Sequence, residues 1–370
     1  MTIEKTVLRP EEDASLRLRA LYRQYGYTTF KMSKFEEYDL YVRNKDFLTA
    51  ERAITFTDTD GKLLALKPDV TLSIIKNSRD AEGQTHKVCY NENVYRISDS
   101  THAWREIPQV GLECLGTVDL YQKSEVLLLA AKSLALLSEE YLMDISHIGM
   151  LQGALSELPD DKALHDRLLR AVSEKNADEV HAMRTEGIID PRHAALFTSL
   201  LSCDGMLSEV LPRLDTLCVN DTMRAAAQEL RELAAILSVE PCLRDHLRLD
   251  FSVLNSMSYY SGLLFQGFIL GIPESVLSGG QYDKLMRKMG RRADAIGFAV
   301  YPDLLQRLPA TAAPRHDADV LLLYSEQDAP ADVHRTVRAL TAGGESVRCA
   351  KCIPDKMTFG RILRLNEGKE

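Results

Sequence analysis

HKVCYNENVYRI at residues 86–97, followed by PQVGLECLG at 108–116, decides the fold, because both are short apolar runs separated by turns. Two further runs of this kind, AITFTD and KLLALKP, lie upstream within residues 53–68. Asp60-Gly61 stands between them and is a strong hairpin signal, since glycine tolerates the positive φ of a tight turn. Together these runs predict an antiparallel sheet.

On either side of these strands the apolar residues change to a helical spacing. A leucine and tyrosine stripe predicts a helix over 11–25 that ends at Gly26, and DLYQKSEVLLLAAKSLALLSE predicts a long helix at 119–139. The run ISHIGML at 145–151 predicts a strand. Between about 153 and 246 nearly every segment is helical in character. We therefore expect an all-helical insertion there.

Strand-like runs return after the insertion, in RLDFSVL, SGLLFQGFIL and AIGFAVYP between residues 248 and 302. LPATAAPRHD at 308–317 is typical of a linker, and ADVLLLY, a helix at 331–342 and ESVRCA predict one βαβ unit beyond it. Such a small unit can hardly support its own core, so we expect it to pack on the main domain or on a partner. We therefore predict an α+β chain with a core domain at 1–152 and 247–308, a helical insertion at 153–246, and a linker and small βαβ C-terminal segment at 309–370.

Charge and composition narrow the possible functions. The 370 residues include 45 Lys and Arg against 54 Asp and Glu, a net charge of −9, whereas a general nucleic-acid surface needs clustered Lys and Arg. The N-terminus lacks the apolar run of a signal peptide, and no apolar stretch is long enough to span a membrane. Seven scattered cysteines do not form a secreted disulfide framework, and Cys349 and Cys352 lack further ligands at zinc spacing. We expect a cytoplasmic protein without a metal site.

Five strings occur in the order and spacing of class II aminoacyl-tRNA synthetases. Over roughly residues 10–308 the chain resembles the histidyl-tRNA synthetase catalytic domain. The strings are YGYTTFKMSKFEEYDLYVR at 25–43, LALKPDVT at 64–71, YRISDSTHAWREIPQVGLECLG at 95–116, LNSMSYYSG at 254–262, and SGGQYDKL at 278–285 followed by AIGFAVYPDLL at 295–305. This resemblance implies a class II synthetase-like antiparallel six-stranded sheet flanked by helices, with an amino-acid pocket and an ATP site side by side on one face.

The resemblance also implies a histidine-binding set. Asp69 and Thr71 stand where the synthetase pattern RPEGT has an acid and a threonine that hold the α-amino group, and an ammonium is well matched to an acid. Gln109 and Glu113 match the pattern HQxGxE of the same pocket, with Glu113 available to an imidazole N–H.

Three further residues belong to the implied set. Tyr259 and Tyr260 match a tyrosine pair that walls the ring, although only one of two successive strand residues need face a ligand. Arg96 matches an arginine that contacts the amino-acid carboxylate and the α-phosphate, and it suits a carboxylate without any nucleotide.

The departures from the synthetase lie on the nucleotide side. Asn255 replaces the arginine of RGLDYY, and Leu304 replaces the arginine of GxGxER that grips the ATP phosphates, with Pro302 at the nearby small residue. Fixed cations at the reacting phosphate are usually the largest electrostatic contribution to such chemistry, and neither replacement supplies one. The tail from 317 is too short for a full anticodon-binding domain. We expect no catalytic residues and no cofactor.

A synthetase-like domain with these changes resembles the regulatory subunit of short-form ATP phosphoribosyltransferase, of the first step of histidine biosynthesis. The resemblance implies a hetero-oligomer with the catalytic subunit, which needs this subunit for activity, and feedback by L-histidine as effector. It also implies a homodimer through the synthetase-like domain, around residues 25–43, and no binding of tRNA or membrane.

Other readings of the same residues remain open. Asp69, Glu113 and Arg96 are also compatible with a buried ion-pair network. The string SGGQYD is compatible either with a simple hairpin turn or with a lining of the pocket. The chain as a whole is compatible with a divergent histidine-activating enzyme that places its cations differently, or with a module that senses uncharged tRNA.

Overall fold

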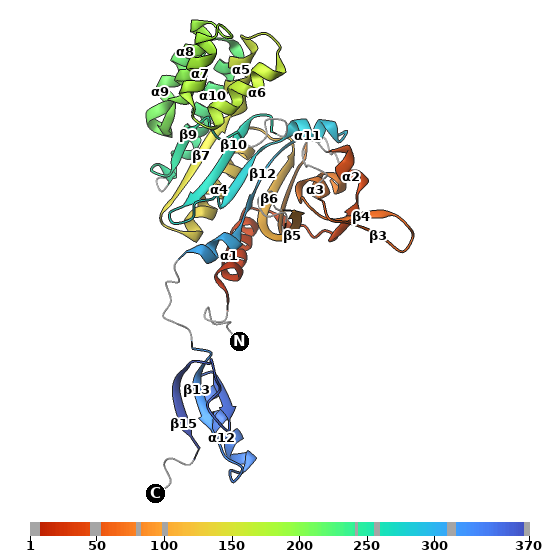
Figure 1. The fold of residues 1–370 in the computed structure, drawn as a ribbon, viewed down its shortest axis with the longest axis vertical. Coiled ribbons are helices and arrows are strands. Elements are labelled where there is room, and N and C mark those ends of the chain that lie inside the picture. The colour runs from red at the N-terminus through yellow and green to blue at the C-terminus, as the bar shows by residue number, and fades with distance from the viewer. Residues whose placement is uncertain are drawn as a thin grey trace. The chain divides into compact units, whose positions relative to one another are not determined.

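The computed structural model describes residues 8–44, 53–78, 83–97, 103–240, 243–254, 260–308 and 316–365. Its contacts divide the chain into two compact units, Met1–Leu308 and Pro309–Glu370. The larger unit contains the central sheet, its covering helices and the inserted helices (Figure 1).

A nine-stranded mixed sheet organises the larger unit, where the sequence predicted six antiparallel strands. Six neighbouring strands do pair antiparallel, but one edge adds β1 parallel to β5, and the other adds β9 parallel to β7 and then β8. The strands, in sheet order, are β1 (Thr28–Thr29), β5 (Thr85–Ile97), β6 (Trp104–Gly116), β12 (Asp294–Val300), β11 (Leu277–Gln281), β10 (Leu263–Ile269), β7 (Tyr141–His147), β9 (Leu247–Asp250) and β8 (Asp204–Met206).

Two long helices, α1 (Pro10–Gln24) and α4 (Leu120–Leu137), pack on one face of this sheet. The carboxylate of Asp119 caps α4 by accepting hydrogen bonds from the first turn, and Gly26 follows α1 with a φ of +83°. The apolar sides of both helices merge with strand residues such as Leu112 and Phe298 into one buried core. Each fully buried leucine or phenylalanine contributes about 1.5–3 kcal/mol, so this core fixes which face of the sheet stays available for a ligand.

A small antiparallel sheet with β4 in the middle lies towards the β5 end of the larger unit (Figure 1). The hairpin predicted at Asp60-Gly61 is confirmed, since β3 pairs antiparallel with β4 and Gly61 has a φ of +80°. The elements of this region are β2 (Phe35–Glu37), α2 (Asp39–Arg43), β3 (Thr55–Thr57), β4 (Leu63–Leu66) and α3 (Thr71–Asn77).

The inserted helices gather at the β7 end of the sheet (Figure 1). They begin at Ile148, so the strand predicted at 145–151 is wrong in its second half. His147 ends β7, and its ring Nδ1 accepts a hydrogen bond from the Gly149 N–H at 3.0 Å, which caps the next helix. The segment is not all-helical, because β8 returns to pair with β9. Its helices are α5 (Ile148–Ser156), α6 (Lys162–Ser173), α7 (Ala177–Thr185), α8 (Pro191–Leu201), α9 (Leu207–Leu217) and α10 (Asp221–Leu237).

Two short elements complete the larger unit: α11 (Asp283–Lys288) between β11 and β12, and a 3-10 helix, η4 (Pro302–Arg307), after β12. Among the residues with a described position, no helix is both long enough and apolar enough to cross a bilayer.

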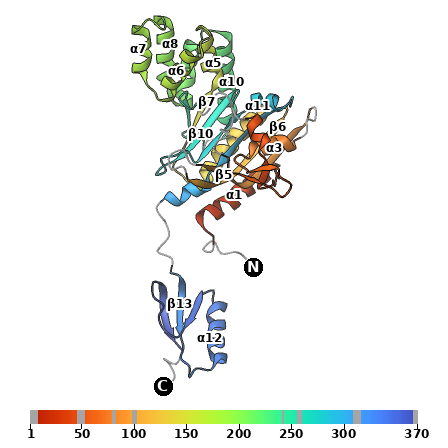
Figure 2. The same cartoon turned by 45° about the vertical axis from the view of Figure 1, so that its right-hand side comes forward.

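The smaller unit is a parallel three-stranded sheet with one helix beside it (Figure 2). It contains the predicted βαβ unit and a third strand, β15, for which there was no prediction. Its elements are β13 (Ala318–Leu323), α12 (Pro330–Ala342), β14 (Val347–Ala350) and β15 (Phe359–Arg364). Cys349 and Cys352 are exposed free thiols.

Candidate functional site

The candidate site lies on the face of the large sheet opposite the core that α1 and α4 cover. Strand pairing sets Glu113 of β6 beside Gly297 of β12, and Gly297 beside Gly280 of β11. Because successive side chains alternate between faces, Gln109 shares the face of Glu113, whereas Leu112 enters the helix-covered core. Two predicted pocket residues are therefore brought to one face by the pleat of a single strand.

Glu113 is the most enclosed acid of the site, with 2% of its surface exposed. The Thr71 hydroxyl donates to one carboxylate oxygen at 2.9 Å, and the Tyr282 hydroxyl donates to the other at 2.6 Å. Burial raises the pKa of Glu113 to about 8, although both hydrogen bonds lower it, and the nearby charge of Asp69 raises it further. In the absence of a cation this carboxyl group is mainly neutral at pH 7.

Two glycines leave room for the side chains of the site. A Cβ on Gly297 would collide with the carboxylate of Glu113, and a Cβ on Gly280 would lie 2.7 Å from the ring of Tyr260. The side chains of Glu113 and Tyr260 therefore occupy the space above Gly297 and Gly280, and a larger residue at either glycine would displace them. The predicted contact role of Tyr260 is compatible with this position beside Glu113.

Asp69 precedes α3 and lies at the second edge of the site. One of its carboxylate oxygens accepts a hydrogen bond from the Leu72 N–H at 2.8 Å, and the other lies 3.8 Å from the guanidinium of Arg96. Burial raises the pKa of Asp69, and Arg96 and the backbone N–H groups oppose that rise. Arg96 is held in turn by the carbonyl of Pro68, which accepts from its Nε at 2.7 Å.

A buried ion pair supports the segment that carries Asp69 and Thr71. The Lys67 side chain is fully buried, and its ammonium lies 2.6 Å from the carboxylate of Glu92. Glu92 stands directly opposite Gln109 in the pairing of β5 with β6, and Gln109 is 5% exposed. The Lys67 carbonyl also accepts from the Tyr95 N–H at 2.9 Å, so this segment is tied to β5 by backbone and side chain together.

This arrangement has the chemistry to hold an α-amino acid. Asp69 offers negative charge to an ammonium, and Glu113 does so once the ammonium has displaced its proton. Arg96 is a third exposed and offers positive charge to a carboxylate. The hydroxyl of Tyr282 and the carboxyl of Glu113 offer polar partners to a side-chain N–H. Within the described ranges, no three His, Cys, Asp or Glu side chains are grouped so that they could hold a metal ion.

The remaining predicted positions differ in their outcome. Tyr259 and Asn255 lie outside the described residues. Leu304 belongs to η4 and packs, half-buried, against the large hydrophobic core. Tyr282 was not predicted as a site residue, although it stands in the string SGGQYD, which is compatible with either a turn or a pocket lining. The two glycines before it, Gly279 and Gly280, were the sequence feature that could have indicated its position in the site.

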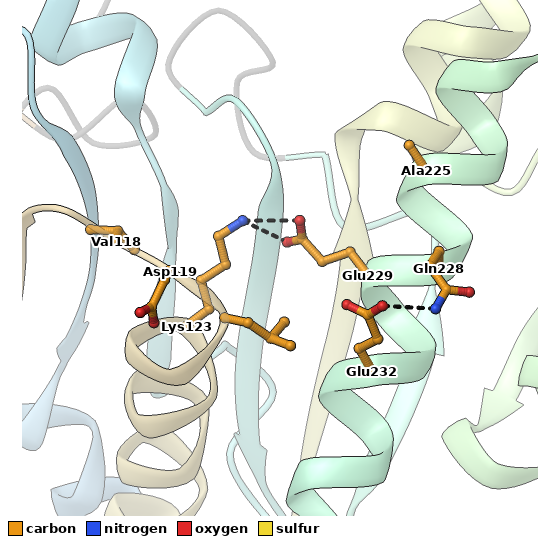
Figure 3. Close-up of a pocket in the computed structure, with 8 residues that line it drawn as sticks. Val118, Asp119, Lys123, Ala225, Gln228, Glu229 and Glu232 are labelled. Atoms are coloured by element: carbon orange, nitrogen blue, oxygen red, sulfur yellow. Dashed lines mark hydrogen bonds and ion pairs between the residues drawn. The ribbon is translucent and has the colours of Figure 1, made fainter.

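A separate cavity of about 350 Å³ lies between α4 and α10, away from these residues (Figure 3). Lys123 reaches across it and binds both carboxylate oxygens of Glu229 at 2.9 Å, and the His147 ring lies 3.7 Å from the same group. Burial alone would raise the pKa of Glu229, but His147 and Lys123 outweigh it and hold the pKa at about 2. These contacts connect the inserted helices to the sheet, so we assign the cavity a structural role.

Comparison with known proteins gives a consistent family assignment. A family profile described as histidyl-tRNA synthetase matches residues 6–305. A Clostridium kluyveri protein named ATP phosphoribosyltransferase regulatory subunit is 27% identical over 322 residues, which cover 84% of this chain and 82% of the relative. A Syntrophotalea carbinolica protein of the same name is 29% identical over 362 residues, 94% of this chain and 83% of the relative.

Two solved structures share the fold. An ATP phosphoribosyltransferase regulatory subunit/histidyl-tRNA synthetase from Bacillus halodurans superposes with a TM-score of 0.77 at 22% identity, covering 96% of this chain and 93% of that one. A chain of the ATP phosphoribosyl transferase (HisG:HisZ) complex from Thermotoga maritima gives a TM-score of 0.62 at 19% identity, covering 78% and 96%. Similarity at this identity establishes a common architecture.

Proposed function

Because the chain belongs to the histidyl-tRNA synthetase family, we propose that it is a non-catalytic regulatory subunit of ATP phosphoribosyltransferase, acting in the first step of histidine biosynthesis. In this role it joins a short-form catalytic subunit in the cytoplasm, is required for its activity, and relays feedback by L-histidine. The names of the relatives support this role, and the chain spans most of their length.

The observation that carries the proposal is the contrast between the candidate site and the position of a lost arginine. At the site, Asp69, Glu113 and Arg96 form a set of ionisable groups suited to an amino acid. Leu304 packs against the hydrophobic core at the position where the family resemblance implies a phosphate-binding arginine. Adenylation develops negative charge at the α-phosphate and needs fixed cations there. The site therefore supports recognition of histidine better than its activation.

The decisive experiment mixes the purified chain with the short-form catalytic subunit of the same organism. We expect phosphoribosyl transfer only when both are present, and inhibition by L-histidine. A Glu113→Gln chain should still activate the catalytic subunit but lose most of the response to histidine, whereas Tyr121→Phe, an exposed change on α4, should behave as the wild type. Unchanged activity of the catalytic subunit on mixing contradicts the proposal.

The alternative of an amino-acid-activating enzyme or a tRNA-sensing module has its own tests. Histidine-dependent exchange of pyrophosphate into ATP by the purified chain would favour the enzyme. A salt-dependent complex with tRNA in a gel shift would favour the module. We expect neither.

We also propose that the chain forms a homodimer through its synthetase-like domain. Exposed aromatic side chains support this: Phe35, which lies in the 25–43 segment, is 48% exposed and stacks edge to face with Phe56, 37% exposed, at 5.3 Å between ring centres. Sedimentation should give a dimer for the wild type and a shift towards monomer for Phe35→Ser/Phe56→Ser. A wild-type monomer at micromolar concentration contradicts this part of the proposal.

A further inference from the structure

Positive charge is concentrated in one short segment of a chain that is acidic as a whole. KLMRKMGRR at 284–292 contains five Lys and Arg and no Asp or Glu, whereas the whole chain has 45 Lys and Arg against 54 Asp and Glu. The segment forms most of α11 and the turn that leads to β12. We call its cations the basic patch, which consists of Lys284, Arg287, Lys288, Arg291 and Arg292.

The helix beneath the basic patch is firmly anchored. Leu285 and Met286 are at most 1% exposed, and they fix α11 in a hydrophobic cluster that it shares with α3. The spacing of Lys284, Arg287 and Lys288 places them on one face of the helix, and all three are exposed. The charges are therefore presented by a fixed element of the fold.

Like charges lie close together on this face. Burial lowers the pKa of Lys284, and the positive charge of Arg287 lowers it further. The guanidinium of Arg287 lies 3.9 Å from the carboxylate of Asp294, but these side chains are 67% and 43% exposed, so solvent weakens their attraction. An acidic surface placed against α11 would relieve the repulsion between Lys284 and Arg287.

Two short helices connect the basic patch to the candidate site. Arg291 donates to two carbonyls in the last turn of α3, at 3.2 and 3.3 Å, so the patch binds the C-terminal end of that helix (Figure 1). The helix α3 begins at Thr71, and α11 directly follows Tyr282. The hydroxyls of Thr71 and Tyr282 both donate to Glu113. Both helices therefore begin at the site and end at the patch.

We propose that the basic patch is the surface on which an acidic face of the catalytic subunit docks. Complementary charge favours such a partner, and the position of the patch places it one short helix away from the histidine site. The acidic balance of the whole chain argues against a nucleic acid as the occupant. This inference rests on the proposed function, because the partner is the subunit that the proposed function names.

The test measures the affinity of the full chain for the catalytic subunit at low and at high salt. We expect Lys284→Glu/Arg287→Glu to weaken the complex about tenfold and to remove much of its salt dependence, because attractive contacts become repulsive. The control, Arg170→Glu/Arg184→Glu, makes the same change of charge at exposed positions of α6 and α7 and should associate like the wild type. Calorimetry with L-histidine, which both variants should bind normally, shows that they are folded.

Two results would overturn the inference and leave the proposed function intact. One is a wild-type complex whose dissociation constant does not change with salt, a measurement that needs no variant. The other is a Lys284→Glu/Arg287→Glu chain that binds L-histidine normally and associates with the catalytic subunit like the wild type.

Two further outcomes have a different meaning. A salt-dependent tRNA complex that the wild type forms and Lys284→Glu/Arg287→Glu does not form would assign the basic patch to nucleic acid and also overturn the inference. A wild-type chain that forms no complex with the catalytic subunit overturns the proposed function and this inference together.

Discussion

Glu113 receives both of its hydrogen bonds from uncharged hydroxyl groups, so nothing in its immediate contacts compensates a negative charge. Its carboxyl group therefore prefers the neutral form, and its pKa is raised to about 8 by burial. A ligand ammonium beside Glu113 and Asp69 supplies the missing charge. We therefore expect the Glu113 carboxyl group to lose its proton when a cationic ligand binds.

The raised pKa makes folding stability depend on pH. Between about pH 4.5 and 8 the folded chain keeps a proton on Glu113 that the unfolded chain has lost, so the unfolding free energy falls as pH rises. We expect Glu113→Gln to remove this dependence on pH. As the pH rises from 5 to 7.5, the unfolding free energy of Glu113→Gln should therefore increase by about 3 kcal/mol relative to that of the wild type. Urea unfolding at several pH values measures it, with the exposed Glu174→Gln as control. If the unfolding free energies of the wild type and Glu113→Gln change in parallel with pH, the raised pKa of Glu113 is contradicted.

Tyr282 offers a second test at the same carboxylate. Its hydroxyl donates at 2.6 Å, and a hydrogen bond to an ionised group contributes about 1.5–3 kcal/mol. We expect Tyr282→Phe to weaken the binding of L-histidine roughly tenfold, because the ionised form of Glu113 loses one of two donors. Calorimetry on this variant and on Tyr121→Phe separates the pocket effect from a general loss of a tyrosine hydroxyl. Equal histidine affinities for both would remove Tyr282 from the site.

The resemblance of two local strings to the synthetase pattern was enough to nominate Asp69, Thr71 and Glu113. The same strings could not show that Gly297, 184 positions after Glu113, vacates the space that its carboxylate fills. The pairing of Glu113 with Gly297 depends on the register between β6 and β12, and the sequence of one strand alone does not determine that register. Tyr282 was missed for the same reason, since its role appears only when β11 lies two strands from β6.

At the scale of elements, β12 is the strand on which the site depends most directly. A Cβ at Gly297 would lie 2.5 Å from the Leu112 carbonyl as well as against Glu113. We expect Gly297→Ala to cost about 1–3 kcal/mol of stability, as overpacking does, and to abolish measurable histidine binding. Thermal unfolding and calorimetry check both effects. Gly343→Ala is the control, because Gly343 has a φ of −80° and nothing nearer than 3.2 Å to the new methyl group.

Most elements of the sheet could be predicted from apolar spacing, but its edges could not. β1 has two residues and β8 three, too few for an alternating pattern, and both join the sheet only through a partner distant in sequence. The change from strand to helix at His147 was hidden because histidine is not a usual N-cap and the apolar run continues through Leu151. The short strands β1, β9 and β8 thus account for the difference between six predicted strands and nine, and the unusual cap accounts for the wrong end of the strand predicted at 145–151.

At the scale of the whole molecule, all described residues of the candidate site lie before Leu308, in the larger compact unit. We expect a chain ending at Leu308 to fold and to bind L-histidine within about twofold of the full chain, because the contacts described for the site residues all lie inside this unit. Calorimetry and thermal unfolding of both chains measure this. A truncated chain that is folded but fails to bind histidine would show that residues 309–370 contribute to the site.

The pairing of β6 with β12 also constrains how the chain can be made. β5 and β6 are neighbours in sequence and can form a hairpin as soon as both have left the ribosome, whereas β12 follows only after the whole helical segment. At ordinary rates of translation that delay lasts about 10–40 s, during which one edge of the hairpin has no partner. Open strand edges recruit other chains, so we expect synthesis of this protein to depend on chaperones that cover the edge until β12 emerges.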